Sequence, residues 1–261
     1  MSSHPHWRVI SASVQGSSHE KTGQACQDAH RCTVSANGLL IVAVADGAGS
    51  APLASEGATI AANAATEYVR NEIEVGELSV ESAEESWSQL LASGLARARD
   101  SILNRAESLS LPSGDLASTL ILLVAGRGWV ASIQAGDGAI VAAGPDGALH
   151  TLSKAAPGEY LNETLFLSSE TVLAEAKPTM WRGDLIHLAV FSDGLQMLAL
   201  QMPAAEPHHG FFAPLFQFVS QQADKEKGNE SLAGFLASSR VRERADDDLT
   251  LVLATLIEAD V

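Results

Sequence analysis

Aspartates follow the ends of several apolar segments, an arrangement in which carboxylates from different strands can bind one cation. Asp46, Asp137 and Asp193 are each followed by glycine and preceded by residues typical of a buried strand. Three further acids, at 246–248, precede the last apolar segment. Carboxylate oxygens are the usual ligands of Mg²⁺ and Mn²⁺, and the sequence has no clustered Cys or His pattern for zinc. The spacing therefore predicts a shared site for hard divalent cations.

An Asp-Gly pair after a strand is also ordinary turn chemistry, and a single example more often marks a turn than a ligand. Pro145-Asp146-Gly147 lies between two short apolar segments, at 139–143 and 148–152. We expect only a hairpin turn at that position.

The elements that must position these aspartates are mostly strands. The run at 39–45 is apolar and rich in β-branched residues, which predicts a buried strand that ends at Asp46. Asn37-Gly38 before it predicts a tight hairpin and an antiparallel start to the sheet. Further strands are predicted at 8–14, 28–35, 116–125, 129–134, 139–143, 148–152, 184–192 and 249–256. Short strands in succession favour antiparallel pairing over βαβ units.

Two long helices are predicted between the early and the later strands. Apolar residues recur at helical spacing over 51–73 and 82–108, and the apolar face of the first helix is mostly alanine, which allows close packing on a sheet. We expect shorter helices at 195–200, 211–222 and 230–239, a polar loop at 16–27 and an irregular segment at 154–182. The order of the predicted strands and helices along the chain indicates an α+β fold. We expect a β-sandwich of two antiparallel sheets flanked by helices in an α-β-β-α arrangement.

Composition limits the classes of function. The chain has 261 residues, 46% of them hydrophobic, and no low-complexity linker, which indicates a single domain over 1–261. The net charge of -16 argues against nucleic-acid binding, since phosphate neutralisation needs clustered Lys and Arg. We find no secretion signal and no segment of membrane-spanning length, so we expect a cytoplasmic protein. Cys26 and Cys32 are accordingly expected to be reduced thiols.

Six motifs, taken in order and spacing, resemble the signature segments of the metal-dependent type 2C protein phosphatases. They are Gln27-Asp28-Ala29, Val44-Ala45-Asp46-Gly47, Ala117-Ser118-Thr119, Gly136-Asp137-Gly138, Ser192-Asp193-Gly194 and Asp247-Asp248-Leu249-Thr250. The resemblance spans nearly the whole chain. Ser18-His19 and Asn162-Glu163-Thr164 are similar to a divergent bacterial branch of the family.

The resemblance implies hydrolysis of phosphoserine and phosphothreonine on proteins by two Mn²⁺ or Mg²⁺ ions, with a third, weaker ion possible. It implies that Asp46 bridges two metals, that the carbonyl of Gly47 binds one of them, and that Asp193 and Asp247 hold the other. Asp137 matches a ligand of the third ion.

Three other residues are expected to support the metal site from behind its ligands. The resemblance implies this role for Asp28, and we extend it to its neighbours in the motifs, Gln27 and Asp248. The expected substrate is a phosphorylated protein, and a cognate Ser/Thr kinase is an expected partner.

The sequence departs from the family in the loop before Asp28. Many relatives carry glutamate where this chain has Gln27, and a phosphate-binding arginine where it has Gly23. His19 and Lys21 are the nearest cationic residues in that loop and are the candidates for phosphate binding. An arginine that often follows the family's Gly-Asp-Ser is also missing. His187, inside an apolar strand, is interpreted as a packing residue.

Two functional hypotheses follow. The first is an active phosphoprotein phosphatase; the second is a catalytically inactive relative that binds a phosphoprotein or a partner kinase as a regulatory module. The intact set of Asp46, Asp193 and Asp247 favours the enzyme. A structural Ca²⁺ protein is disfavoured because the sequence contains no compact D-x-D-x-D-G loop.

Overall fold

The apolar run that ends at Asp46 forms strand β3 (Leu40–Asp46) of a five-stranded antiparallel sheet. The computed structural model describes residues 5–76, 78, 82–153 and 164–258. The predicted hairpin joins β3 to β2 (Asp28–Val34), and Gly38 in it has a positive φ of 81°. The sheet order is β2-β3-β4-β5-β8, with the remaining strands at β4 (Leu120–Gly126), β5 (Trp129–Ala135) and β8 (Thr179–Arg182).

A second five-stranded sheet has the order β1-β12-β9-β6-β7. Its strands are β1 (His6–Val14), β12 (Leu249–Ile257), β9 (His187–Phe191), β6 (Ala139–Ala143) and β7 (Leu149–Ser153). The turn predicted at Pro145-Asp146-Gly147 is confirmed, because Asp146 is exposed and its Oδ1 accepts a hydrogen bond from the Ala148 amide. Both sheets are antiparallel throughout.

The central strands are buried on both faces, which explains why their sequences are apolar without alternation. In β3, Leu40, Val42 and Val44 belong to the core between the sheets, where they meet Val252 and Ala254 of β12. The intervening residues of β3 belong to a second core beneath the helices. Because every side chain of such a strand leaves water, an unbroken apolar run is required.

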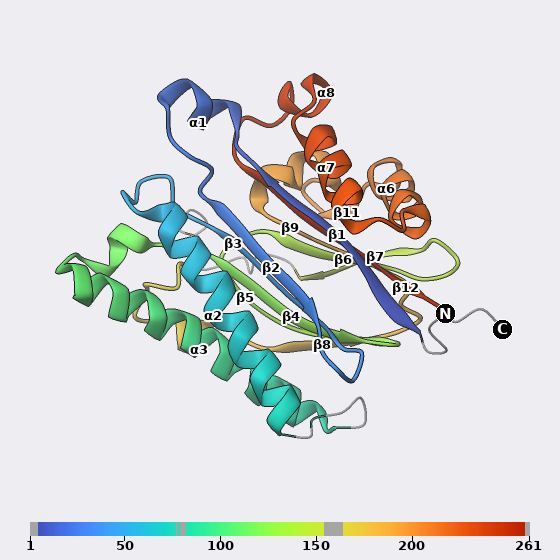
Figure 1. Cartoon of the computed structure of the whole chain (residues 1–261), viewed down its shortest axis with the longest axis horizontal. Coiled ribbons are helices and arrows are strands. Elements are labelled where there is room, and N and C mark those ends of the chain that lie inside the picture. Colours follow the sequence, from blue (N-terminus) through green and yellow to red (C-terminus); the bar gives the residue numbers. More distant parts are fainter. Residues whose placement is uncertain (1–4, 77, 79–81, 154–163, 259–261) are drawn as a thin grey trace.

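Helices α2 (Ala54–Val75) and α3 (Glu84–Leu109) cover the outer face of the first sheet (Figure 1). The predicted alanine face of α2 is buried, and so is the predicted apolar face of α3, including Trp87 and Ile102. Trp87 packs against Trp129 of β5 with ring centroids 4.9 Å apart. These contacts fix the two helices on the sheet that carries Asp46.

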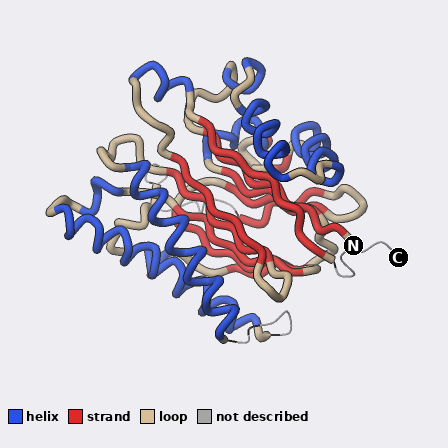
Figure 2. Tube along the Cα trace, in the orientation of Figure 1, coloured by secondary structure: helices blue, strands red, loops and turns tan. Residues whose placement is uncertain are grey.

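The outer face of the second sheet is covered by α6 (His209–Gln221) and α7 (Lys225–Leu236), with α5 (Gln196–Ala199) and α8 (Ser239–Arg242) beside them. Figure 2 shows the resulting order of layers, helix, sheet, sheet, helix. The predicted α-β-β-α sandwich is therefore confirmed. Within the described part of the chain, we find no helix with the length and apolar character needed to cross a membrane. Cys26 and Cys32 are free thiols, as predicted.

Three local predictions were wrong. The segment 154–182 is not wholly irregular, because it contains α4 (Val172–Glu175) and β8, which pairs with β5; residues 154–163 lie outside the described residues. The strand predicted to begin at residue 116 begins at Leu120, after a 3₁₀ turn, η1 (Ser113–Leu116). The loop at 16–27 contains a short helix, α1 (Ser17–Thr22). Each missed element is short or half-exposed, so it leaves little periodicity in the sequence.

A further difference follows β9. The helix predicted at 195–200 is divided into a 3₁₀ turn, η2 (Asp193–Leu195), and the single turn of α5. The chain then forms a small hairpin of β10 (Leu200–Gln201) and β11 (Glu206–Pro207). The helix predicted at 230–239 begins earlier, at Lys225, because the Asp224 carboxylate accepts hydrogen bonds from the first amides of α7.

Candidate metal centre

Antiparallel pairing brings the acidic ends of four strands to one edge of the sandwich. β3 ends at Asp46, whereas β9 ends just before Asp193. β6 and β12 lie on either side of β9 and run antiparallel to it. Phe191, the last residue of β9, pairs with Ala139 at the start of β6 and with Leu251 near the start of β12. The acids that precede β6 and β12 therefore meet the acids that follow β3 and β9.

The carboxylates of Asp46, Asp137 and Asp193 form one cluster. Each offers an oxygen, and these oxygens all lie within 4.8 Å of one another. Burial raises the pKa of Asp46 well above its usual range, and the charges of Asp28 and Asp193 act in the same direction. Burial is also the largest cause that raises the pKa of Asp193, and the negative charges of Asp137 and Asp247 raise it further. A divalent cation would relieve this repulsion and restore the charged forms, so the donor set fits a hard metal ion.

Asp46 is held in place through hydrogen bonds of its backbone. Its amide donates to Oγ1 of Thr119 at 3.0 Å, and its carbonyl accepts from the Thr119 amide at 2.8 Å and the Ser118 hydroxyl at 3.1 Å. Gly47 follows, and a Cβ there would lie 2.6 Å from the carbonyl oxygen of Ala54. Only glycine allows this close approach between the end of β3 and the start of α2.

Asp28 and Gln27 lie behind Asp46, and each has a buried side-chain oxygen that accepts no hydrogen bond from the described residues. Asp28 pairs with Asp46 across β2 and β3, and its Oδ2 accepts a hydrogen bond of 2.7 Å from the Ser192 hydroxyl. Oδ1 of Asp28 and Oε1 of Gln27 are buried and have no donor among the described residues. Buried oxygens of this kind normally bind water or an ion, which agrees with a hydrated metal centre beside them.

Asp248 organises the loop that precedes Asp28. Its carboxylate is buried and accepts hydrogen bonds from the amide of Gly16 at 2.7 Å, the amide of Gln27 at 2.5 Å and Nδ1 of His19 at 2.9 Å. The backbone of 246–248 is also enclosed, because a Cβ on Gly16 or on Gly194 would lie 2.2 Å from one of its atoms. Asp248 is thus a structural partner of His19 and the loop.

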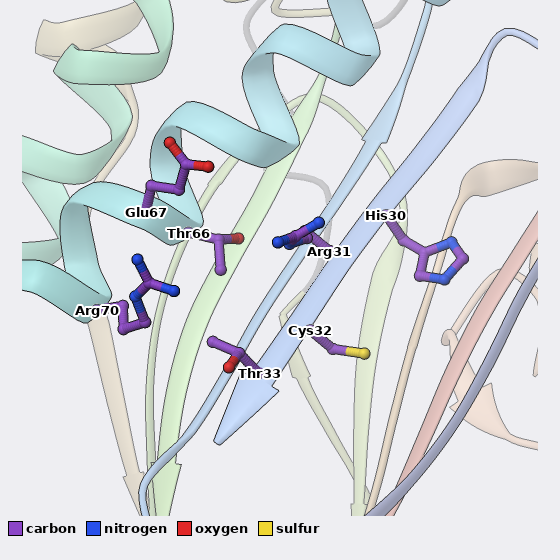
Figure 3. Close-up of a pocket in the computed structure, with 7 residues that line it drawn as sticks. All are labelled: His30, Arg31, Cys32, Thr33, Thr66, Glu67 and Arg70. Atoms are coloured by element: carbon purple, nitrogen blue, oxygen red, sulfur yellow. The ribbon is translucent and has the colours of Figure 1, made fainter. Parts of the chain in front are cut away.

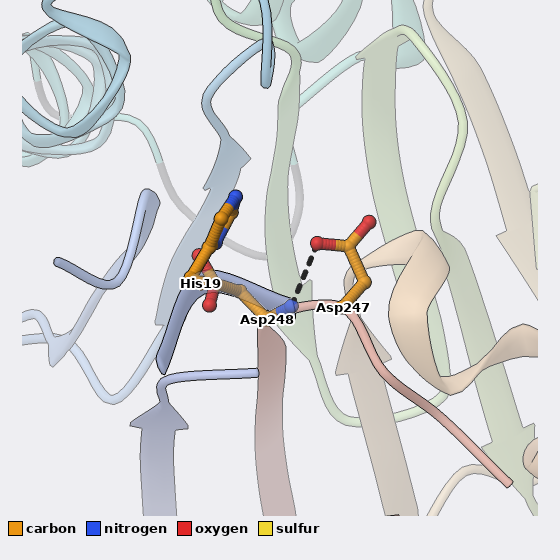
Figure 4. A group of neighbouring side chains, drawn as sticks. All are labelled: His19, Asp247 and Asp248. Carbon is orange, nitrogen blue, oxygen red and sulfur yellow. Dashed lines mark hydrogen bonds and ion pairs between the residues drawn. The ribbon is translucent and has the colours of Figure 1, made fainter. Parts of the chain in front are cut away.

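Asp247 lies beside this group. It is exposed, and its carboxylate oxygen and the ligand atoms of His19 and Asp248 lie within 4.8 Å of one another (Figure 4). The Asp248 amide donates to Oδ1 of Asp247 at 2.8 Å. Asp247 is near enough to Asp193 for its charge to raise the pKa of that carboxyl. The predicted ligands therefore lie in two neighbouring groups, with Asp46, Asp137 and Asp193 in one and Asp247 in the other.

The two phosphate-binding candidates differ in setting. The His19 side chain is 12% exposed and bound to Asp248, whereas Lys21 is exposed on α1. Gly23, at the position where the resemblance led us to expect a phosphate-binding arginine, follows the last residue of α1 with φ of 71°. An arginine side chain would strain the backbone at that position.

Several residues of the site were not assigned a role from the sequence. Ser192 and Thr119 lie inside the quoted motifs, but only the structure identifies their partners, Asp28 and Asp46. Thr164 donates to Oδ2 of Asp137 at 3.2 Å, whereas Asn162 and Glu163 lie outside the described residues. His187 packs as predicted, stacked on Phe216 with ring centroids 4.8 Å apart.

Comparison with known proteins agrees with this geometry. The family model described as Protein phosphatase 2C matches residues 15–237. Serine/threonine-protein phosphatase 3 of Escherichia coli (strain K12) is 34% identical over 259 residues, covering 97% of this chain and 99% of that protein.

Solved structures share the fold at low identity. The serine/threonine phosphatase Stp1 from Staphylococcus aureus has a TM-score of 0.63 at 11% identity, covering 98% of both chains. RsbX in complex with magnesium has a TM-score of 0.55 at 16% identity, covering 97% of this chain and 96% of that one. Because the family model and the 34% identical relative both cover most of the chain, the chain belongs to the protein phosphatase 2C family.

Proposed function

We propose that this protein hydrolyses phosphoserine and phosphothreonine monoesters on proteins at a centre of two Mn²⁺ or Mg²⁺ ions. The observation that carries the proposal is the cluster of Asp46, Asp137 and Asp193 carboxylates within 4.8 Å at the strand ends. The family membership, the 34% identical serine/threonine-protein phosphatase and the magnesium complex of RsbX support it. The substrate is then a phosphoprotein, and a kinase must supply its phosphoryl group.

In this proposal Asp46 would be a ligand of both ions, the Gly47 carbonyl would be a ligand of one, and Asp193 and Asp247 would be ligands of the other. Asp137 binds a third, weaker ion. When bound, paired divalent cations supply a nucleophilic water of lowered pKa and neutralise charge on the transferring phosphoryl group. The carboxylates need no covalent step of their own, and their part is to fix positions and balance charge.

The residues behind the ligands keep that arrangement rigid. Ser192 bonds both Asp28 and the Thr250 amide, so β2, β9 and β12 are held together at the site. The Asp248 carboxylate accepts from Nδ1 of His19, so Nε2 is the other nitrogen of that ring, and it can donate to a phosphoryl oxygen when the imidazole carries both protons. His19 is therefore our first candidate for the role of the missing arginine, with Lys21 as the second.

The alternative of a catalytically inactive binding module is less well supported. A module that only bound a phosphoprotein or a kinase would not need three mutually repelling carboxylates in one half-buried cluster. Their retention is understandable if they hold metal for hydrolysis.

The test is phosphate release from phosphothreonine and phosphoserine peptides, measured with added Mn²⁺, with added Mg²⁺ and after chelation. We expect release with either metal and none after chelation. Full activity after exhaustive chelation would contradict the metal mechanism. Peptide binding without release under any metal condition would favour the inactive module.

A further inference from the structure

A cavity of about 220 Å³ lies between β2 and α2 (Figure 3). The residues that line it are His30, Arg31, Cys32, Thr33, Thr66, Glu67 and Arg70. None of them is an expected metal ligand. The volume of the cavity lies below the usual range for pockets that bind drug-sized ligands, and it suits a small ion with some water.

Strand alternation decides which of these side chains face the helix. Arg31 and Thr33 point toward α2, whereas His30 and Cys32 point to the opposite face of β2, where Cys32 packs against the core between the sheets. Nδ1 of His30 is hydrogen-bonded to the Ser13 hydroxyl of β1. The charged groups around the cavity are therefore Arg31, Arg70 and Glu67.

Two polar groups beside the cavity lack partners. Thr66 is 2% exposed, and its hydroxyl has no hydrogen-bond partner among the described residues. Thr59, two turns earlier in α2, donates to the carbonyl of Ser55 at 2.8 Å, so the hydroxyl of a threonine in this helix can be satisfied locally. Nε of Arg70 is likewise buried without a partner among the described residues. Unsatisfied buried donors are costly, which points to a ligand that accepts from them.

Neither arginine is neutralised by a neighbouring acid. Within the described ranges, no carboxylate oxygen lies within 4.0 Å of Arg31 or Arg70, although Glu67 lines the same cavity. Arg70 makes one long hydrogen bond, 3.4 Å, to Oδ1 of Asn71. Two unpaired guanidinium groups at one cavity are unexpected on a chain with a net charge of -16, and they favour an anionic ligand.

We infer that this cavity is an oxyanion site that binds a phosphate group between Arg31, Arg70 and Thr66. Two guanidinium groups and a hydroxyl present more donors than the two oxygens of a carboxylate can accept, whereas a phosphate group has three or four oxygens. Glu67 offsets one positive charge, so the three charged side chains around the cavity keep a net positive charge.

This site is separate from the metal centre. Arg31 is three residues beyond Asp28, ~10 Å along β2, and the two side chains leave opposite faces of the strand. One phosphoryl group cannot occupy both sites. The ligand is therefore inorganic phosphate, the product of the proposed reaction, or a second phosphoryl group on a multiply phosphorylated protein.

The test is calorimetric titration of the full chain with inorganic phosphate, after divalent metal has been removed so that the metal centre contributes no phosphate affinity. The variants are Arg31→Gln, Arg70→Gln and Thr66→Val, and the matched control is Arg97→Gln, at an exposed position of α3. We expect each of the first two to raise the Kd about tenfold or more, and Arg97→Gln to leave it unchanged.

Thr66→Val separates a binding role from a structural one. It removes the unsatisfied hydroxyl at similar volume, so it should weaken phosphate binding without lowering the melting temperature in phosphate-free buffer. Absence of phosphate binding to the wild type at millimolar concentration, or equal Kd values for Arg31→Gln, Arg70→Gln and Arg97→Gln, would overturn the inference. Because no turnover is measured, failure here leaves the proposed phosphatase activity untouched.

A competition experiment assigns the source of the phosphate group. A phosphoserine peptide that displaces inorganic phosphate from the wild type, but binds Arg31→Gln more weakly, identifies a protein-borne ligand. If the phosphopeptide does not displace inorganic phosphate from the wild type, the ligand of the cavity is the free phosphate ion.

Discussion

The hydroxyl of Ser192 donates a hydrogen bond of 2.7 Å to Oδ2 of Asp28 and so joins the two sheets at their acidic edge. Oγ of Ser192 in turn accepts a hydrogen bond from the Thr250 amide at 3.0 Å. Ser192 follows β9, Asp28 begins β2 and Thr250 lies in β12, so one buried hydroxyl connects three strands. This bond stabilises the charged form of a buried carboxyl that lies directly behind Asp46.

Ser192→Ala should therefore destabilise the protein. The substitution leaves Oδ2 of Asp28 buried without this donor, which costs about 1–3 kcal/mol in the free energy of unfolding. Urea denaturation in the presence of Mn²⁺ measures the effect. Ser108→Ala is the control, because that exposed hydroxyl donates only to the Arg105 carbonyl in its own helix. Equal stabilities of the two variants would mean that the inter-sheet bond contributes nothing.

Asp46→Ala, Asp193→Ala and Asp247→Ala should each reduce turnover by orders of magnitude while the fold stays intact. Each removes a proposed metal ligand, and none of the three side chains belongs to an apolar core. Steady-state hydrolysis of a phosphothreonine peptide, with circular dichroism to check folding, measures this. Asp146→Ala in the hairpin turn is the control and should remain active. A similar loss at Asp146 would contradict our separation of turn from ligand.

Gln27→Glu should tighten metal binding. The amide oxygen of Gln27 is buried without a donor, and a carboxylate there adds a negative charge near the proposed dications. At an effective dielectric of about 20 to 80, a charge pair ~4 Å apart is worth roughly 1 to 4 kcal/mol, so we expect about tenfold or more in affinity.

The measurement is the Mn²⁺ concentration that gives half-maximal activity, at one pH and ionic strength. Turnover at saturating metal should change less. Superimposable titration curves for the wild type and Gln27→Glu would show that a charge at position 27 does not affect metal binding.

The metal-free protein should lose stability as pH rises toward neutrality. Burial raises the pKa of Asp28 from 3.8 to about 7, with the charge of Asp248 adding to the effect. A carboxyl with a raised folded-state pKa binds its proton more tightly when folded, so its contribution to stability is lost as pH rises from about 4 through about 7.

Denaturation of the metal-free protein between pH 5.5 and 8.5 measures this slope. Asp28→Asn removes the titrating group and should flatten the dependence of the free energy of unfolding on pH below pH 7. This variant therefore distinguishes the contribution of Asp28 from that of repulsion among the other acids. Added Mn²⁺ should flatten it as well, because a bound cation favours the ionised carboxylate. A pH slope that is identical in the wild type and Asp28→Asn would contradict the assignment.

The fold was largely predictable because its signals are strong and local. The unbroken apolar run before Asp46 and the Asn37-Gly38 turn predict β3 and its hairpin, and the alanine face of α2 predicts the packing on that sheet. In contrast, β8 has four half-buried or exposed residues, and its position is set by pairing with β5. Such tertiary pairing leaves no periodic signal in the sequence.

The sequence identified most acids of the candidate site, but not how they are grouped in space. Repeated Asp-Gly pairs identified Asp46, Asp137 and Asp193, which the structure brings together. The hydrogen bonds of Asp248 to His19, Gly16 and the Gln27 amide depend on the packing of segments more than two hundred residues apart. Arg31 and Arg70 carry no motif, and only the structure brings them to one cavity.

The place of β12 has a consequence for protein synthesis. β12 lies between β1 and β9, so a chain growing on the ribosome carries both neighbours without the strand that joins them until residues 249–257 have been made. The sheet of β2, β3, β4, β5 and β8 needs nothing beyond Arg182. Asp247 and Asp248 emerge together with β12. A nascent chain can therefore pair the strands of the first sheet and cover its outer face with α2 and α3, but the inner face of that sheet lacks its β12 partners, and the acidic edge lacks Asp247, until the last strand has been made.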